Sequence, residues 1–279
     1  MRFLEVLKAI FLGIVEGITE WLPVSSTGHM ILFDELVKLN VSDEFKEMFL
    51  VVIQLGAILA VPTLFWHRLW PFGKSNSKEQ RKGVVQLWLK VITGAVPAAV
   101  LGFLLDDFLD EHLYTHWVVA ITLILYGIAF ILVEYFNKKR NVTYRVENVS
   151  DLTYRDALMI GAFQVLSLIP GTSRSGSTIL GGMLTGVSRT ASAEFSFFMA
   201  IPIMLGASGL KILKFILEGV SVSRIEIGLL LIGIAVAYLV SLAVIRFLMD
   251  FVKRHSFSPF GVYRIVLGIV VIGYFLLFK

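Results

Sequence analysis

Two glutamates, Glu16 and Glu20, lie four residues apart in a largely apolar segment at residues 3–22. In a helix this spacing places both carboxylates on one face, about one turn apart. Inserting a charged side chain into a membrane costs roughly 2.5–3.5 kcal/mol, and two neighbouring carboxylates also repel each other. The pair therefore predicts a divalent metal ion (Mg²⁺ or Ca²⁺), because Mg²⁺ typically takes one or two carboxylates plus phosphate oxygens. The alternative is a segment at the membrane interface whose glutamates face water.

A hydroxyl-rich run, Ser25-Ser26-Thr27-Gly28-His29, follows Pro23 and precedes a second apolar stretch. Hydroxyl groups and free N–H groups at the start of a helix form an anion-binding site. His29 can exchange a proton with Ser26 or with a bound water, since the pKa of histidine lies near physiological pH. The alternative is an ordinary Ser/Thr helix cap in which His29 only packs.

The segment PGTSRSGST at residues 170–178 places one arginine in a Gly-rich, hydroxyl-rich turn before a third apolar stretch. The guanidinium group of Arg174 can hold a phosphate through two parallel hydrogen bonds, and Ser173, Ser175 and Thr178 can add hydroxyl contacts. A structural turn whose arginine reaches a lipid headgroup is the alternative. Together the three motifs supply two acids, a histidine, an arginine and several hydroxyls, which is what phosphoryl transfer requires.

The composition places these motifs in a membrane protein. The 279-residue chain is 57% hydrophobic and 16% charged, with a mean hydropathy of +0.81. A soluble domain usually carries about 25% charged residues, so lipid must solvate much of this chain. The net charge of +4 does not indicate nucleic acid, because lysine and arginine gather in a few short loops between apolar segments. The absence of cysteine excludes disulfides and thiolate chemistry.

The apolar pattern predicts an all-α polytopic membrane protein with six full spans and two broken helical pairs. The spans are expected near residues 47–66, 86–105, 117–136, 194–217, 226–249 and 259–278. The broken pairs are expected at 3–22 with 29–39, and at 155–169 with 177–187. Gly13–Glu16 aligns with Gly161–Gln164, and Pro23–Gly28 aligns with Pro170–Gly176 after a slip of one residue. The chain is thus predicted to hold a first repeat at 1–136, a cytoplasmic linker at 137–153 and a second repeat at 154–279.

The distribution of basic residues predicts how the two repeats lie in the membrane. Lysine and arginine concentrate in the loops at 67–90, at 137–155 and at 253–254, whereas the connection at 106–116 is acidic. Cytoplasmic loops carry the excess of basic residues. The loops alternate correctly only if each broken pair is a re-entrant hairpin, which inverts the second repeat relative to the first and places both termini outside.

The motifs together resemble the undecaprenyl-pyrophosphate phosphatase family of the bacitracin-resistance type. The resemblance rests on EGITEWLPVSSTGH and PGTSRSGSTILGGMLTGVSR, and extends through VIQLGAILAV, VPAAVLG and SAEFSFFMAIP over essentially the whole chain. It implies hydrolysis of a polyprenyl pyrophosphate to the monophosphate and inorganic phosphate, which recycles the cell-wall lipid carrier. It also implies dependence on a divalent metal and an active site that opens to the external side of the bacterial plasma membrane. The motifs of the family map onto Glu16 and Glu20, onto Ser25, Ser26, Thr27 and His29, and onto Ser173, Arg174 and Thr178.

The chemistry leaves three mechanisms open, and the architecture leaves a second function open. Our first choice is Ser26 as the nucleophile, activated by His29, with the metal on Glu16 and Glu20 and with Arg174 holding the pyrophosphate. In the second mechanism His29 is the nucleophile, and in the third a metal-bound water attacks directly. Inverted repeats with broken helices are also typical of secondary transporters, so a transporter or flippase for a lipid or anionic substrate is the alternative function. Membrane lipids are expected partners, and a homodimer is compatible with the sequence.

Overall fold

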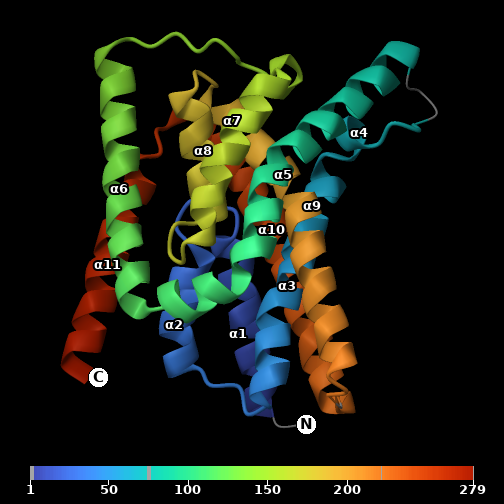
Figure 1. The fold of residues 1–279 in the computed structure, drawn as a ribbon, viewed down its shortest axis with the longest axis vertical. Helices are drawn as coiled ribbons and strands as arrows, with labels where there is room; N and C mark the ends of the chain where they lie inside the picture. The colour runs from blue at the N-terminus through green and yellow to red at the C-terminus, as the bar shows by residue number, and fades with distance from the viewer. Residues whose placement is uncertain (1–2, 74–76, 221, 279) are drawn as a thin grey trace.

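The computed structural model describes residues 3–73, 77–220 and 222–278, and these are almost entirely helical, with no β-strand among them. Eleven α-helices and two short 3₁₀ helices follow one another in this described part of the chain (Figure 1). In order they are α1 (Phe3–Thr19), α2 (Ser26–Leu36), α3 (Asp43–Leu64), α4 (Trp66–Leu69), α5 (Lys78–Leu113), α6 (His116–Lys139), η1 (Val149–Asp151), α7 (Tyr154–Val165), η2 (Leu166–Leu168), α8 (Arg174–Leu184), α9 (Arg189–Leu217), α10 (Arg224–Arg254) and α11 (Ser258–Phe278).

Six of these helices are long and apolar enough to cross a membrane, which confirms the predicted number of spans. They are α3, α5, α6, α9, α10 and α11. Helix α5 extends beyond its predicted span of 86–105 at both ends. A capping box of Ser77 and Gln80 starts it at Lys78, and it continues through most of the predicted connection at 106–116 to Leu113. The protein is therefore a multi-pass membrane protein. The short helix α4 was not predicted.

The two predicted broken pairs form two helical hairpins, α1–α2 and α7–α8. Helix α1 ends four residues before Pro23, and α7 ends five residues before Pro170, in keeping with the inability of proline to continue a helix. In Figure 1 the hairpin α1–α2 lies in the lower half and α7–α8 in the upper half, and their turns approach each other near mid-height. Their re-entry into a membrane stays a prediction.

Close contacts between glycines join each hairpin to one long helix in the same way. A Cβ atom on Gly13 of α1 would lie 2.8 Å from the carbonyl oxygen of Gly233 in α10. A Cβ atom on Gly161 of α7 would lie 2.2 Å from the carbonyl oxygen of Gly94 in α5. Small residues allow such close approach between membrane helices. The two contacts thus join corresponding helices of the two predicted repeats, whose inversion stays a prediction.

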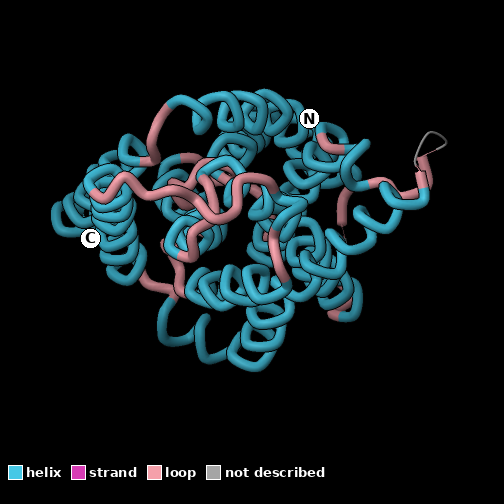
Figure 2. The backbone as a smooth tube through the Cα atoms, turned by 90° about the horizontal axis from the view of Figure 1, so that it is seen from above, coloured by secondary structure: helices cyan, strands magenta, loops and turns pink. Residues whose placement is uncertain are grey.

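Both chain ends lie at the lower end of the bundle in Figure 1, and the linker between the repeats lies at the upper end. The view along the bundle in Figure 2 shows the linker as a loop that crosses the ends of the helices. Helix α6 continues to Lys139, so the linker is slightly shorter than predicted, and part of it is the unpredicted η1. Val146 in the linker pairs with Val187, and the N–H of Ser188 donates to the carbonyl of Val146.

Two ion pairs anchor the linker end of the bundle. Arg145 pairs with Asp156 at the start of α7. Burial by itself raises the pKa of Asp156, but the hydrogen bonds from Arg145 and Thr153 outweigh it and hold this pKa below its ordinary value. Arg189 of α9 pairs with the buried Glu134 of α6. The first pair joins the linker to the second hairpin, and the second pair joins two spans to each other.

Candidate active site

The two hairpin turns have the same local structure at equivalent positions. Ser25 and Ser173 both adopt left-handed backbone conformations, with φ of 72° and 73°. Each side chain caps the following helix: the Oγ of Ser25 accepts from the N–H of Gly28 at 3.2 Å, and the Oγ of Ser173 accepts from the N–H of Gly176 at 3.1 Å. Residues other than glycine rarely adopt this conformation, and such strain clusters at functional sites. Both serines therefore present the N-terminus of a helix at the meeting point of the hairpins.

The two turns are joined by a cluster of Glu20, Ser26 and Arg174. The Nη2 atom of Arg174 lies 3.0 Å from Oε1 of Glu20, and its Nε atom lies 3.3 Å from the same oxygen. The Oγ of Ser26 donates to Oε2 of Glu20 at 3.1 Å. The side chains of Arg174 and Glu20 are only 11% and 8% exposed, so the ion pair is nearly dehydrated. The structure thus brings an acid, a hydroxyl and a cation from both repeats into direct contact.

Helix α9 and the second turn support this cluster from the other side. The Nη1 atom of Arg174 donates to the carbonyl oxygen of Ser196 at 2.9 Å, and the Oγ1 of Thr178 donates to the Oγ of Ser196 at 2.7 Å. The Oγ of Ser175 is 3.2 Å from each of the carbonyl oxygens of Glu20 and Leu22. Ser175 and Thr178 therefore hold the turns in place, whereas Ser173 and Thr27, which are half-buried, lie at the entrances of their helices.

Histidine 29 is held away from Ser26. Its Nδ1 atom is 2.7 Å from the carbonyl oxygen of Ser25, and its Nε2 atom is 2.6 Å from the hydroxyl of Tyr263 in α11. The ring also stacks on Tyr263, with centroids 5.6 Å apart. The sequence favoured His29 as the group that activates Ser26, whereas in the structure the Ser26 hydroxyl donates to Glu20. Both ring nitrogens of His29 are already occupied, one by the backbone of the same helical turn and the other by Tyr263 of the distant helix α11.

Glu16 provides the test of whether the site suits a metal ion. It is 1% exposed, and its Oε1 atom has no hydrogen-bond partner. A buried carboxylate without a partner is costly, and a ligand on this oxygen would offset that cost. No group of three or more His, Cys, Asp and Glu side chains is arranged for metal binding among the described residues. The donor set of Glu16 and Glu20 fits a hard cation such as Mg²⁺ or Ca²⁺, which would take its other oxygens from phosphate or water.

The equivalent position in the second repeat holds Gln164. Its side chain is also 1% exposed, and neither its Nε2 nor its Oε1 atom has a hydrogen-bond partner. The second repeat therefore carries an uncharged amide where the first carries a carboxylate.

Sequence reasoning missed three residues that contact the site: Ser196, Tyr263 and Arg264. Arg264 lies in α11, is completely buried and donates to backbone oxygens of both turns. A single arginine within an otherwise apolar span is itself a signal of function, because charged residues are rare at membrane depth. Nothing comparable marks Ser196, whose role depends on a contact between distant segments.

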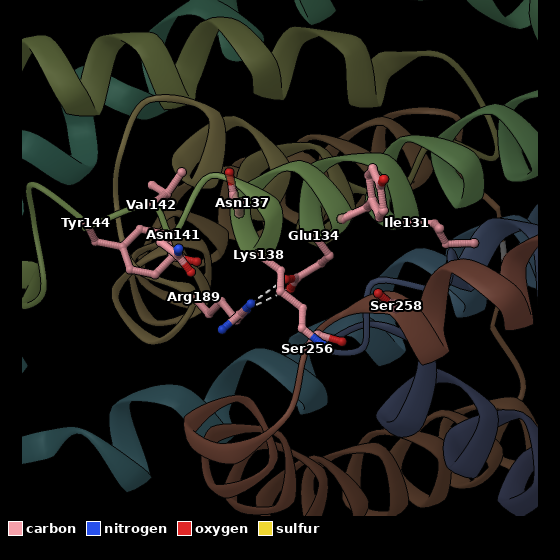
Figure 3. A pocket seen from close by; sticks show the side chains of 11 residues that line it. Ile131, Glu134, Asn137, Lys138, Asn141, Val142, Tyr144, Arg189, Ser256 and Ser258 are labelled. Atoms are coloured by element: carbon pink, nitrogen blue, oxygen red, sulfur yellow. Dashed lines mark hydrogen bonds and ion pairs between the residues drawn. The ribbon is translucent and has the colours of Figure 1, made fainter.

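A cavity of about 550 Å³ lies elsewhere, beside the linker at the end of α6. Figure 3 shows the ion pair of Glu134 and Arg189 in this cavity. Its lining residues are Ile131, Glu134, Tyr135, Asn137, Lys138, Asn141, Val142, Tyr144, Arg189, Ser256 and Ser258. None of them belongs to the hairpin turns, so this cavity is separate from the candidate active site.

Comparisons with known proteins agree with this geometry. The profile of the family described as "Bacitracin resistance protein BacA" matches residues 9–270. The chain is 58% identical over 274 residues to a protein of Enterococcus faecalis named undecaprenyl-diphosphatase, a match that covers 98% of each chain. It is 54% identical to an undecaprenyl-diphosphatase of Acetivibrio thermocellus, covering 98% of each chain. It is 51% identical to undecaprenyl-diphosphatase 1 of Clostridium acetobutylicum, covering 99% of this chain and all of that protein. With its two capped turns, its acid–serine–arginine cluster and these full-length matches, the chain belongs to the BacA family of bacitracin resistance proteins.

Proposed function

We propose that this protein is an integral membrane phosphatase that hydrolyses undecaprenyl diphosphate to the monophosphate and inorganic phosphate. The observation that carries this proposal is the contact of Glu20 with both Ser26 and Arg174. A transporter requires binding groups but no nucleophile, whereas this cluster places a serine hydroxyl directly on a buried carboxylate. All three relatives described above are named as diphosphatases, so the transporter alternative gains no support from them.

The geometry favours Ser26 as the attacking group. Its hydroxyl already donates to Glu20, which can accept the proton as the serine oxygen attacks the terminal phosphorus. The bond from that phosphorus to the bridging oxygen breaks, and the lipid monophosphate leaves. Glu20 passes this proton to the departing monophosphate and then takes a proton from the water that attacks the phosphate on Ser26. The bond from phosphorus to the Ser26 oxygen breaks, inorganic phosphate leaves, and Glu20 returns the proton to Ser26. His29 is less suited to attack, because backbone and tyrosine contacts occupy both of its ring nitrogens.

The positive groups of the second repeat would bind the pyrophosphate. The ion pair with Glu20 neutralises part of the charge of Arg174 in the absence of substrate. Its forked donors and the N-terminus of α8 can contact phosphate oxygens as the negative charge shifts during the reaction. A divalent metal ion would be held chiefly by Glu16, whose Oε1 atom has no partner, with Glu20 beside it, and would supply further positive charge to the phosphate oxygens.

The orientation in the membrane is also part of this proposal. Both termini lie at one end of the bundle, and the linker with its basic residues lies at the other (Figure 1). Basic loops are retained in the cytoplasm, so the termini face the outside. We infer that the site opens to the external side of the bacterial plasma membrane, among membrane lipids. The homodimer stays a prediction.

The experiment is an assay of phosphate release from a polyprenyl pyrophosphate by the purified full-length protein in detergent. We expect release with Mg²⁺ or Ca²⁺ and its loss in EDTA. The matched control is Arg246→Gln, which removes an exposed arginine from α10. Arg174→Ala should abolish release, and Arg246→Gln should not. Absence of release by the wild-type protein under every metal condition would contradict the proposal and favour the transporter.

A further inference from the structure

Arg264 is a fully buried cation that bonds to the backbone of both hairpin turns. Its Nη1 atom donates to the carbonyl oxygen of Pro23 in the first turn at 3.1 Å. Its Nη2 atom donates to the carbonyl oxygens of Gly171 at 2.9 Å and Thr172 at 3.0 Å in the second turn. The residue is 0% exposed. One guanidinium group therefore connects two turns that are about 150 residues apart in the sequence.

The partners of Arg264 described above are backbone carbonyl oxygens, and its two remaining contacts are also to groups without a formal charge. Its Nε atom donates to the carbonyl oxygen of Leu123 in α6 at 3.4 Å, and its Cζ atom lies 5.5 Å from the centre of the Tyr126 ring. A buried charge is costly unless hydrogen bonds satisfy its donors. Only the planar fork of arginine can point donors at separate backbone oxygens in fixed directions, whereas lysine has a single nitrogen. All four hydrogen bonds of Arg264 therefore go to backbone carbonyl oxygens, an arrangement that holds backbone in place.

The preceding residue acts on the same site. The hydroxyl of Tyr263 is 2.6 Å from Nε2 of His29, and the two rings stack. The neighbouring residues Tyr263 and Arg264 of α11 therefore contact the first residues of α2, the first turn and the second turn. Helix α11 also packs along α6 through the closely approaching Gly127 and Gly261, which anchors it independently of the hairpins. It is a rigid support from which both turns can be held.

We propose that Arg264 is a positioning residue, which fixes the turn that carries Glu20 and Ser26 against the turn that carries Arg174, with Tyr263 orienting His29. This inference rests on the proposed phosphatase function. The reacting groups come from separate repeats, so their spacing depends on contacts between the turns. A displacement of about 1 Å at a remote position can reduce turnover about 100-fold.

The kinetic consequence separates positioning from folding. In Arg264→Gln, Arg174 and the capped N-terminus of α8 remain available to bind phosphate. We therefore expect kcat per folded molecule to fall about 100-fold, with a much smaller change in KM. Arg264→Lys keeps the charge but cannot reach both turns, so it should also lose turnover, although to a lesser extent. Arg246→Gln is the matched control, since it removes an exposed arginine from another span.

A distance measurement tests the same inference without activity. The chain has no cysteine, so in a variant with Ile18→Cys in α1 and Leu166→Cys in η2 the spin labels attach to these two positions and to no others. Both positions precede the turns, and their side chains are 37% and 41% exposed. Double electron–electron resonance spectroscopy should give a narrow distribution of distances between the two labels when Arg264 is present. It should give a broader or shifted distribution in Arg264→Gln and an unchanged one in Arg246→Gln.

The outcomes distinguish this inference from the proposed function. Wild-type turnover per folded molecule in Arg264→Gln, or full turnover in Arg264→Lys, would overturn the positioning role. An unchanged distance distribution in Arg264→Gln would overturn it as well. If Arg264→Gln does not fold, Arg264→Lys supplies both measurements. A wild-type protein without phosphatase activity would refute the proposed function, whereas the spin-label distances would still decide whether Arg264 joins the turns.

Discussion

The ion pair of Glu20 and Arg174 should stabilise the protein through the contact between the two repeats. A double-mutant cycle with Glu20→Gln, Arg174→Met and the combined variant tests this expectation. The two charges lie 3.0 Å apart, with side chains that are 8% and 11% exposed. Removing one partner of a buried pair costs about 3–5 kcal/mol, because the other charge stays buried without compensation. For a chain of this size about 2–4 °C of melting temperature corresponds to each kcal/mol, so each single variant should melt roughly 6–20 °C lower.

The combined variant should recover much of this loss. With both charges absent, no buried ion remains unpaired, so its destabilisation should be smaller than the sum of the two single losses by about 2–3 kcal/mol. The assay is thermal unfolding in detergent with EDTA, so that no cation can replace Arg174. Phosphate release should fall at least about 100-fold in all three variants, since stability returns without the catalytic charges. Strict additivity, or a single variant as stable as the wild type, would refute the reasoning that this pair joins the repeats.

Three further predictions follow from individual contacts. Ser26→Ala should reduce phosphate release by about 10³-fold or more if the hydroxyl attacks, and a loss below about tenfold would limit Ser26 to orienting the substrate. Gly161→Ala should destabilise the protein by about 1–3 kcal/mol in thermal unfolding, since its Cβ would overlap the backbone of α5. The control Gly206→Ala has open space at the Cβ position and should not be destabilised. The lowered pKa of Asp156 contributes stability above about pH 4 that is lost as the pH falls through the folded-state pKa, so Asp156→Asn should weaken the acid-induced drop in melting temperature.

The architecture could be predicted further than the chemistry of the site. Six spans and two breaks were evident because hydropathy and proline act locally along the chain. The residue types at the turns also identified Glu20, Ser26 and Arg174 before their contact was seen. The partner of Ser26 could not be predicted, because it depends on how α2 is rotated and on Tyr263 from a span more than 200 positions away.

The arrangement of the site suggests why the two repeats keep a common backbone but different side chains. Ser25 and Ser173 cap equivalent helices with nearly the same strained conformation, so each repeat offers a helix N-terminus to an anion. The next residue differs: Ser26 in the first repeat is a potential nucleophile, and Arg174 in the second is a cation. A second glutamate in place of Gln164 would add negative charge beside a substrate that is itself strongly anionic. Under the proposed mechanism, the shared backbone would supply two anion-binding helix ends, and their differing side chains would divide attack and charge stabilisation between the repeats, so that neither repeat would contain a complete site by itself.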